Sequence, residues 1–299
     1  MNLFISSFKM KKFIKRGIVF LLLTLIVLLS LGISSVLITQ QTFNYSICED
    51  KNILIVGNSH TECGINDKVL KRSTNLSKSA SSFFYHYIKL KSFSSKNSHI
   101  DTIIVSLNYD DLWEIREDRF LGDERIEQKM NQNIFMFEIE DYFDLLKANP
   151  VSVILQSLVM YSEFYNLQIE GRSLIGGYKI LERYKLEQAK EIFWEGKEED
   201  GSGVISQSEL KYLIRVYKYC ESHHLKLILI NTPLHPLLEK ELNKHEKDHI
   251  DLINKNMPNA SYLNHANFVL PDSAFSDLSH LNYKGATIYS QYLQEQFDK

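Results

Sequence analysis

The amino-acid sequence predicts an α/β fold, a three-layer α/β/α sandwich with a central parallel sheet, preceded by one N-terminal transmembrane helix. Two patterns support this prediction: short β-branched apolar runs alternate with stretches of helical length, and one uncharged apolar run lies near the N-terminus. The 299 residues suit one sizeable domain plus a short addition, because domains cluster around ~100–200 residues. The formal charge of −3 argues against the basic surface of a nucleic-acid-binding protein, and three cysteines cannot form a disulfide scaffold.

The apolar run covers residues 17–38 and is long enough to cross a bilayer as a helix, which takes ~20 residues. Basic side chains precede it, and no acidic residue occurs among the first 48 residues. The basic residues are Lys9, Lys11, Lys12, Lys15 and Arg16. Because positive charge stays on the cytoplasmic side, we expect residues 1–16 to be a cytoplasmic tail and residues 17–38 a single-pass signal anchor. The bulk of the chain would then be periplasmic or extracellular.

A cleaved signal peptide is the alternative for this segment. The apolar core of a signal peptide usually has ~7–15 residues, and no A-x-A cleavage site follows the run. An uncleaved anchor therefore agrees better with the sequence.

Beyond a linker at residues 39–51, three short apolar runs at residues 52–56, 102–106 and 225–230 are typical of buried parallel strands. Expected helices lie between and after them, at 83–91, 138–146, 181–193, 209–221, 236–254 and 284–296. The alternation predicts a doubly wound sheet over residues 52–299, with a helical insertion at about 118–203. In such folds the active crevice lies beyond the carboxyl ends of the strands.

Candidate catalytic residues follow the first strand and precede the last helix. Ser59 lies in the sequence Gly-Asn-Ser-His, at the turn that leaves the first strand. A serine becomes a nucleophile only beside a base, and His280 is the candidate base. Asp277, three residues before His280, can hold the imidazole in one tautomer.

An oxyanion hole needs hydrogen-bond donors aimed at the developing negative charge. Asn108 follows the strand at 102–106, so its amide is one candidate donor. The loop at 75–80 ends another expected short strand and offers the backbone N–H of Ala80. The backbone N–H of Ser59 is the third candidate.

Taken together, these four blocks resemble the SGNH/GDSL hydrolase superfamily, in particular its membrane-anchored bacterial envelope members. The resemblance covers residues from about 52 to the end and implies a flavodoxin-like sheet, with Ser59 as nucleophile, His280 as base and Asp277 as acid. It also implies oxyanion donors at Asn108 and near Ala80. The sequence departs from the family pattern at Asn58, where aspartate is common, and at Ala80 or Ser77 and Ser106, where glycine is usual.

Alternatives remain for several of these residues. Asp272 is a rival acid, and Asp277 could instead cap the final helix. Asn108 could form an Asx turn. His60 lies beside the proposed nucleophile and is either structural or in contact with substrate. Cys63 lacks a histidine and acid of its own, so we expect a buried thiol.

No metal or organic cofactor is expected. Residues 198–209 match an EF-hand calcium loop at several positions but begin with glutamate where the pattern requires aspartate, which favours an exposed turn. His223, His224 and His235 lack a carboxylate or cysteine at ligand spacing, and we expect them in a solvated helix end and loop.

The predicted function is that of a serine esterase or O-acyltransferase acting through an acyl-enzyme. The expected substrates are O-acyl groups, particularly acetyl, on an envelope or extracellular glycan, with envelope polysaccharide machinery as a candidate partner. The alternatives are a non-catalytic surface module that binds glycan or protein, and a bitopic interaction protein.

Overall fold

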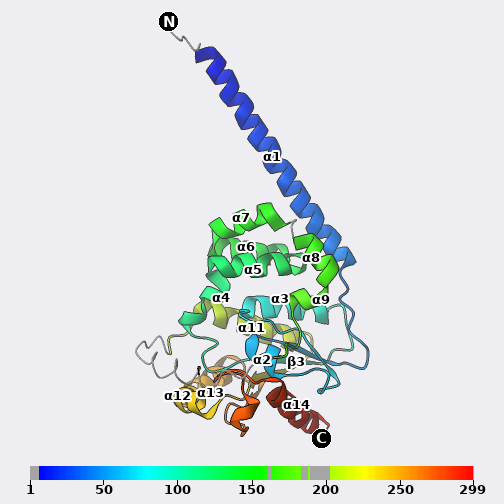
Figure 1. The fold of residues 1–299 in the computed structure, drawn as a ribbon, viewed down its shortest axis with the longest axis vertical. Coiled ribbons are helices and arrows are strands. Elements are labelled where there is room, and N and C mark those ends of the chain that lie inside the picture. The colour runs from blue at the N-terminus through cyan, green and yellow to red at the C-terminus, as the bar shows by residue number, and fades with distance from the viewer. Residues whose placement is uncertain (1–6, 161–162, 183–187, 189–202, 299) are drawn as a thin grey trace.

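A long N-terminal helix projects from an α/β domain in the computed structural model, which describes residues 7–160, 163–182, 188 and 203–298 (Figure 1). The helix, α1, covers Ser7–Thr42 without a break. Its segment Met10–Thr42 is the one helix among the described residues that is long and apolar enough to cross a membrane. The first residues of the expected linker therefore belong to the helix.

The core of the domain is a five-stranded parallel sheet in the order β2-β1-β3-β4-β5. The strands are β1 Ile53–Val56, β2 Ser73–Asn75, β3 Thr102–Ser106, β4 Lys226–Asn231 and β5 Ser261–Asn264. The predicted α/β fold class is confirmed, and the strand order is that of flavodoxin-like folds. Strand β5 was not predicted from the sequence, because this edge strand is only half-buried and carries no continuous apolar run.

Alternating side chains of the strands pack on two helical layers. Leu54 and Val56 face a core with α3 (Phe83–Ser94) and α11 (Gln207–Ser222). Ile53 and Ile55 face the second core, which includes Tyr289 and Leu293 of the last helix, α14 (Tyr283–Phe297). The short helix α2 (Ser59–Gly64) leads from β1 and contacts α14.

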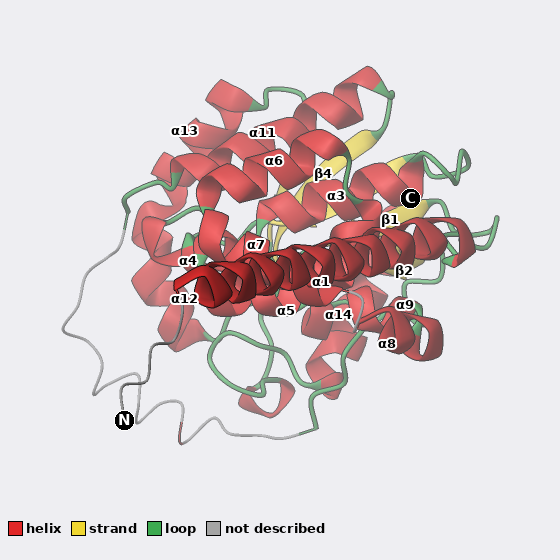
Figure 2. Cartoon of the chain, turned by 90° about the horizontal axis from the view of Figure 1, so that it is seen from above, coloured by secondary structure: helices red, strands yellow, loops and turns green. Residues whose placement is uncertain are grey.

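Between β3 and α11 the chain builds a group of helices over α3 (Figure 1). They are η1 Glu114–Arg116, α4 Asp118–Leu121, α5 Asp123–Asn133, η2 Ile134–Met136, α6 Ile139–Ala148, α7 Pro150–Val159, α8 Glu163–Glu170 and α9 Arg172–Ile175. Helices α7 and α8 and the short η2 contact α1, and α7 lies beside α1 in both overall views (Figures 1 and 2). Most of the helix expected at 181–193 lies outside the described residues.

The expected helix at 236–254 is broken into three pieces. These are α12 Pro236–Leu242, η4 Asn243–His245 and α13 Glu246–Asn256. Asn243 caps the end of α12, and asparagine is a weak helix former. After β5, the short η5 (Asp272–Ala274) leads to α14.

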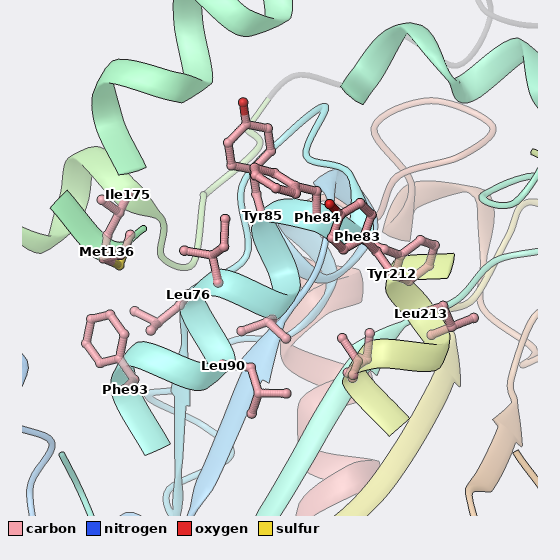
Figure 3. Packing of buried hydrophobic residues seen from close by; sticks show 14 of the residues in the cluster. Leu76, Phe83, Phe84, Tyr85, Leu90, Phe93, Met136, Ile175, Tyr212 and Leu213 are labelled. Atoms are coloured by element: carbon pink, nitrogen blue, oxygen red, sulfur yellow. The ribbon is translucent and has the colours of Figure 1, made fainter. Parts of the chain in front are cut away.

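Figure 3 shows how the insertion is attached to the sandwich. Phe84 and Phe93 of α3 lie in one continuous cluster of buried side chains. Ile175 and Met136 enter the cluster from the insertion, and Tyr212 enters it from α11. Because these rings and aliphatic chains are fully or nearly fully buried, the insertion packs as part of the sandwich.

Glu209, in the first turn of α11, is a buried carboxyl group. Its Oε2 accepts a 2.8 Å hydrogen bond from the Phe83 N–H at the start of α3, where the Ser82 side chain makes no capping bond. Oε1 has no partner among the described residues. Burial raises the pKa of Glu209 to about 8.

We expect this group to make folding stability depend on pH. The pKa of this carboxyl group is higher in the folded chain than in the unfolded chain, so the group stabilises the fold fully at pH values below its unfolded pKa. This stabilisation is lost as the pH rises toward the folded pKa of about 8. Chemical denaturation of the parent chain should therefore show a falling free energy of unfolding between about pH 5 and pH 8. Glu209→Gln should flatten this dependence, while Glu295→Gln, at an exposed position of α14, should not. Equal slopes in the parent chain and both variants would contradict the assignment to Glu209.

Candidate active site

The turn after β1 places Ser59 at the start of α2. Asn58 caps this helix, because its side-chain oxygen accepts a 3.0 Å bond from the His60 N–H. A Cβ on Gly57 would come within 2.6 Å of the Ser106 Cβ and would also clash with Thr61. Only glycine therefore fits between β1 and α2, and the turn directs the Ser59 hydroxyl outward from the end of the sheet.

Ser59, His280 and Asp277 form a continuous hydrogen-bonded series. The His280 Nε2 lies 2.8 Å from the Ser59 Oγ, and its Nδ1 lies 2.9 Å from both carboxylate oxygens of Asp277. Asp277 Oδ1 also accepts the N–H groups of Ser279 and His280, each at 2.8 Å. Burial opposes ionisation of Asp277, but the hydrogen bond from His280 and these N–H groups lower its pKa below the usual value. The series thus ends in a carboxylate that orients the imidazole.

Asp272, the rival acid, is directed at a different histidine. Its Oδ1 lies 3.2 Å from Nε2 of His235. The prediction that His235 lies in a solvated loop is wrong. His235 is nearly fully buried at the start of α12 and packs against the Phe275 ring. Asp277, by contrast, lies beside His280.

Ser59 and Ala80 line the same cavity and have backbone N–H groups that are candidate donors. Those of Ser59 and Ala80 donate to no acceptor in the described part of the chain, and both residues line the cavity. Ala80 has φ 53°, in the left-handed region where glycine is favoured, which agrees with the glycine that the family pattern has here. The two groups are available to a developing oxyanion.

Asn108, the side chain expected as an oxyanion donor, has its hydrogen-bond partners inside the domain. Its side chain is fully buried, and its Nδ2 donates to Ser106 Oγ at 3.2 Å and to Asp111 Oδ2 at 3.0 Å. Its Oδ1 accepts the Thr232 N–H at 3.3 Å. Because both amide hydrogens are already donated below the surface, Asn108 braces the strand ends and does not line the cavity.

Glu62, which no sequence pattern predicted, lies next to the candidate site and contacts the residue before Ala80. It is buried in α2, and its Oε2 accepts the Ser79 N–H at 2.8 Å and the Ser79 hydroxyl. Lys129 Nζ donates to the Ser79 carbonyl at 2.7 Å, so the residue before Ala80 is held from both sides. No local pattern marks Glu62, because its partner lies 17 residues away on another loop.

We expect Glu62→Gln to lower kcat for ester hydrolysis and to leave KM nearly unchanged. The substitution replaces a charged acceptor by a neutral amide, so the Ala80 N–H is held less firmly where charge develops in the transition state. Loss of a whole oxyanion donor costs about 10²–10³-fold in kcat, so a loosened donor should cost about tenfold.

Steady-state kinetics with p-nitrophenyl acetate measure this effect. Glu295→Gln, an exposed change on α14, is the matched control. Glu62→Asp, which keeps the charge, should recover part of kcat. A rise in KM at unchanged kcat would contradict a positioning role.

His60 and Cys63 lie beside the triad. The His60 ring stacks on His280 with 5.1 Å between ring centroids, and burial together with His280 lowers its pKa to about 4. His60 is therefore neutral at pH 7, and its Nδ1 is buried without a partner among the described residues. Burial raises the pKa of Cys63 to about 12, so it stays a thiol and is a poor nucleophile.

The triad opens into a cavity of about 940 Å³. Four basic side chains line it: Arg116, Arg119, Arg125 and Lys179. Its apolar side chains are Trp113, Leu181, Leu234, Leu238 and Leu242. Two of the arginines are paired with carboxylates, Arg116 with Asp110 and Arg119 with the buried Asp111. The cavity thus offers both hydrogen-bond donors and an apolar surface beside Ser59.

No group of three or more His, Cys, Asp or Glu residues with metal-binding geometry occurs within the described ranges. The first residues of the EF-hand-like stretch at 198–209 lie outside them. Glu209, its last residue, is turned to the start of α3 by its bond to Phe83.

Comparisons with known proteins give the following matches. A protein-family model that carries no descriptive name matches residues 186–299, less than half of the chain. No curated protein matches the sequence. Among solved structures, a GDSL-like lipase from Bacteroides thetaiotaomicron is similar at 7% identity, with a TM-score of 0.41 over 87% of this chain and 93% of its own. A putative acylhydrolase from Bacteroides fragilis is similar at 9% identity, with a TM-score of 0.40 over 87% of this chain and 92% of its own.

Two of the residues at which the sequence departs from the SGNH/GDSL pattern, Asn58 and Ser106, are hydrogen-bonded to each other. Ser106, where glycine is usual, donates to the Asn58 Oδ1 at 3.1 Å. Asn58, where aspartate is common, donates through Nδ2 to Asp111 at 2.6 Å, and Arg119 binds the same Asp111 oxygen at 3.0 Å. Asp111, in the loop after β3, is therefore the acidic residue that contacts the turn between β1 and α2.

Proposed function

We propose that the protein is a membrane-anchored serine esterase or O-acyltransferase that acts on O-acyl groups, particularly acetyl, of an envelope or extracellular glycan. The observation that carries this proposal is the hydrogen-bonded series Ser59–His280–Asp277 at the edge of an open cavity. A nucleophile, a base and an orienting acid in this order are the parts that acyl transfer requires.

In the proposed mechanism His280 Nε2 takes the Ser59 hydroxyl proton as Oγ attacks the ester carbonyl. The tetrahedral oxyanion accepts hydrogen bonds from the N–H groups of Ser59 and Ala80. His280 returns the proton to the leaving alcohol, and the acyl group stays on Oγ. Water or a sugar hydroxyl then attacks this acyl-enzyme with His280 again as base, which releases Ser59.

The cavity supports a substrate larger than a simple acetate ester. Its volume exceeds what an acetyl group needs, and its arginines and Lys179 are donors that can bind glycan hydroxyl or carboxylate oxygens. Hydrolysis and transfer would both proceed from the same acyl-enzyme, with water as the acceptor in the first and a sugar hydroxyl in the second.

We further propose that α1 is an uncleaved signal anchor, with the N-terminus in the cytoplasm and residues 52–299 as the catalytic domain outside it. The charge distribution around residues 17–38 supports the orientation. The unbroken helix to Thr42, whose end packs on the domain, favours retention over cleavage.

Labelling of the full-length chain in detergent with a fluorophosphonate probe tests the function. Mass spectrometry should find the adduct on the peptide that contains Ser59. A folded chain that neither labels nor hydrolyses p-nitrophenyl acetate would overturn the enzymatic proposal in favour of a non-catalytic module that binds glycan or protein.

A further inference from the structure

Helix α7 exposes an apolar surface on one side while it packs on the protein with the other. Its buried side chains include Val153 and Ser157, and Met160 follows at its end. The exposed side chains recur at helical spacing and retain 43–68% of their accessible surface: Val151, Ile154, Leu155 and Val159. A helix that is apolar on both sides is typical of a buried or lipid-contacting helix, not of one facing water.

The position of α7 relative to α1 indicates what covers this surface. The buried side of α1 near its end is formed by Gly32, Ser35 and Thr39, and α1 contacts α7 and α8. At Gly32 the approach is close, because a Cβ there would lie 2.5 Å from the Met160 Cε and 3.3 Å from the Ser157 carbonyl oxygen. The end of α7 therefore touches α1 at a residue inside the apolar run 17–38.

The depth of this contact follows from helix geometry. Residues 17–38 span about 33 Å at about 1.5 Å per residue, close to the ~30 Å hydrocarbon core. Gly32 lies six residues before the end of the run, which is about 9 Å along the helix. A helix that packs on α1 at Gly32 thus reaches the outer boundary of the hydrocarbon core.

We propose that the exposed side of α7, formed by Val151, Ile154, Leu155 and Val159, is a lipid-contacting surface that inserts into the outer membrane–water interface beside α1. This inference rests on the proposed membrane anchor and adds a second membrane contact to it. Interfacial helices bury their apolar side about 5–10 Å into the boundary between headgroups and acyl chains. Figure 1 shows α7 at the edge of the domain next to the projecting part of α1. With α1 and α7 both in contact with the bilayer, the domain would be held in one orientation on the membrane, with the sheet on the far side of the insertion.

Quenching by brominated lipid tests the proposal on the full-length chain in vesicles of phosphatidylcholine and phosphatidylglycerol. Leu155→Trp adds a fluorophore on the exposed side of α7, and its emission is compared with that of the parent chain, which has two tryptophans. The matched control is Val269→Trp, since Val269 is 92% exposed on a loop after β5. Acyl chains brominated close to the headgroup should quench the added Leu155→Trp emission and leave the Val269→Trp emission unchanged, and the Leu155→Trp emission should also be blue-shifted.

The outcomes separate the two membrane contacts. Equal quenching of Leu155→Trp and Val269→Trp, in protein that floats with the vesicles, would overturn the α7 proposal and favour a second copy of the chain or another protein on this surface. Protein that does not float with the vesicles would overturn the anchor itself, and the α7 proposal with it. Neither result bears on Ser59, whose fluorophosphonate labelling is read separately. Each variant is shown to be folded if it unfolds in detergent at the same temperature as the parent chain.

Discussion

Ser59→Ala is expected to abolish ester hydrolysis, with a fall in kcat of about 10⁴–10⁶-fold. The substitution removes the oxygen atom that we propose forms the acyl-enzyme and leaves His280 without the hydroxyl group to which it is hydrogen-bonded. Residual catalysis would come from binding and the two backbone N–H donors alone. Initial rates with p-nitrophenyl acetate and labelling by a fluorophosphonate measure the effect, and both should be lost together.

The matched control for this prediction is Ser279→Ala. Ser279 lines the same cavity and lies between Asp277 and His280, but its hydroxyl is not part of the triad. The control should keep most of the activity. Labelling that survives Ser59→Ala would place the nucleophile elsewhere, with Cys63 as the next residue to replace despite the raised pKa of its thiol.

Gly285→Ala is expected to lower both stability and activity. Gly285 lies in the first turn of α14, where a Cβ would clash with the Ala274 carbonyl oxygen and lie 3.1 Å from its carbon. The start of α14 cannot shift easily, because the Asn282 N–H donates to the same carbonyl oxygen at 2.9 Å. Overpacking of this kind costs about 1–3 kcal/mol, so Tm should fall by several degrees.

The activity loss follows from the position of this contact. Ala274 and Asn282 flank the loop that carries Asp277 and His280, so a displaced helix moves the imidazole away from Ser59. Thermal unfolding and kcat should be measured for Gly285→Ala beside Gly177→Ala, where a Cβ would meet no atom within 4 Å. An unchanged Tm in Gly285→Ala would contradict this prediction, because it would show that the start of α14 can move away from Ala274 without loss of stability.

Local patterns in the sequence were enough to predict the three main strands, the membrane-length helix and the candidate triad. Buried parallel strands and membrane spans both leave continuous apolar runs, which need no partner to be identified. Ser59 was predicted because it follows the first apolar strand, and Asp277 and His280 were predicted because they lie three residues apart just before the last expected helix. The structure places Ser59 and His280 in contact across 221 residues of sequence.

The tertiary structure alone decided the direction and the partners of the polar side chains. Asn108 occupies the predicted position after β3, yet its amide is turned inward by Asp111 and Ser106. Glu62 contributes to the site only because β1 and β2 are neighbours and bring α2 against the loop after β2. A hydrogen bond is directional and short, so its formation depends on distances that sequence spacing does not determine.

The same distinction applies to α7. Its composition shows that it is apolar, and its length alone is too short to cross a membrane. Only its packing on α1 at Gly32 brings its exposed side to the depth at which lipid would cover it. Apolar periodicity is a property of neighbouring residues along the chain and is visible in the sequence, whereas the partner of an apolar surface depends on how distant segments pack.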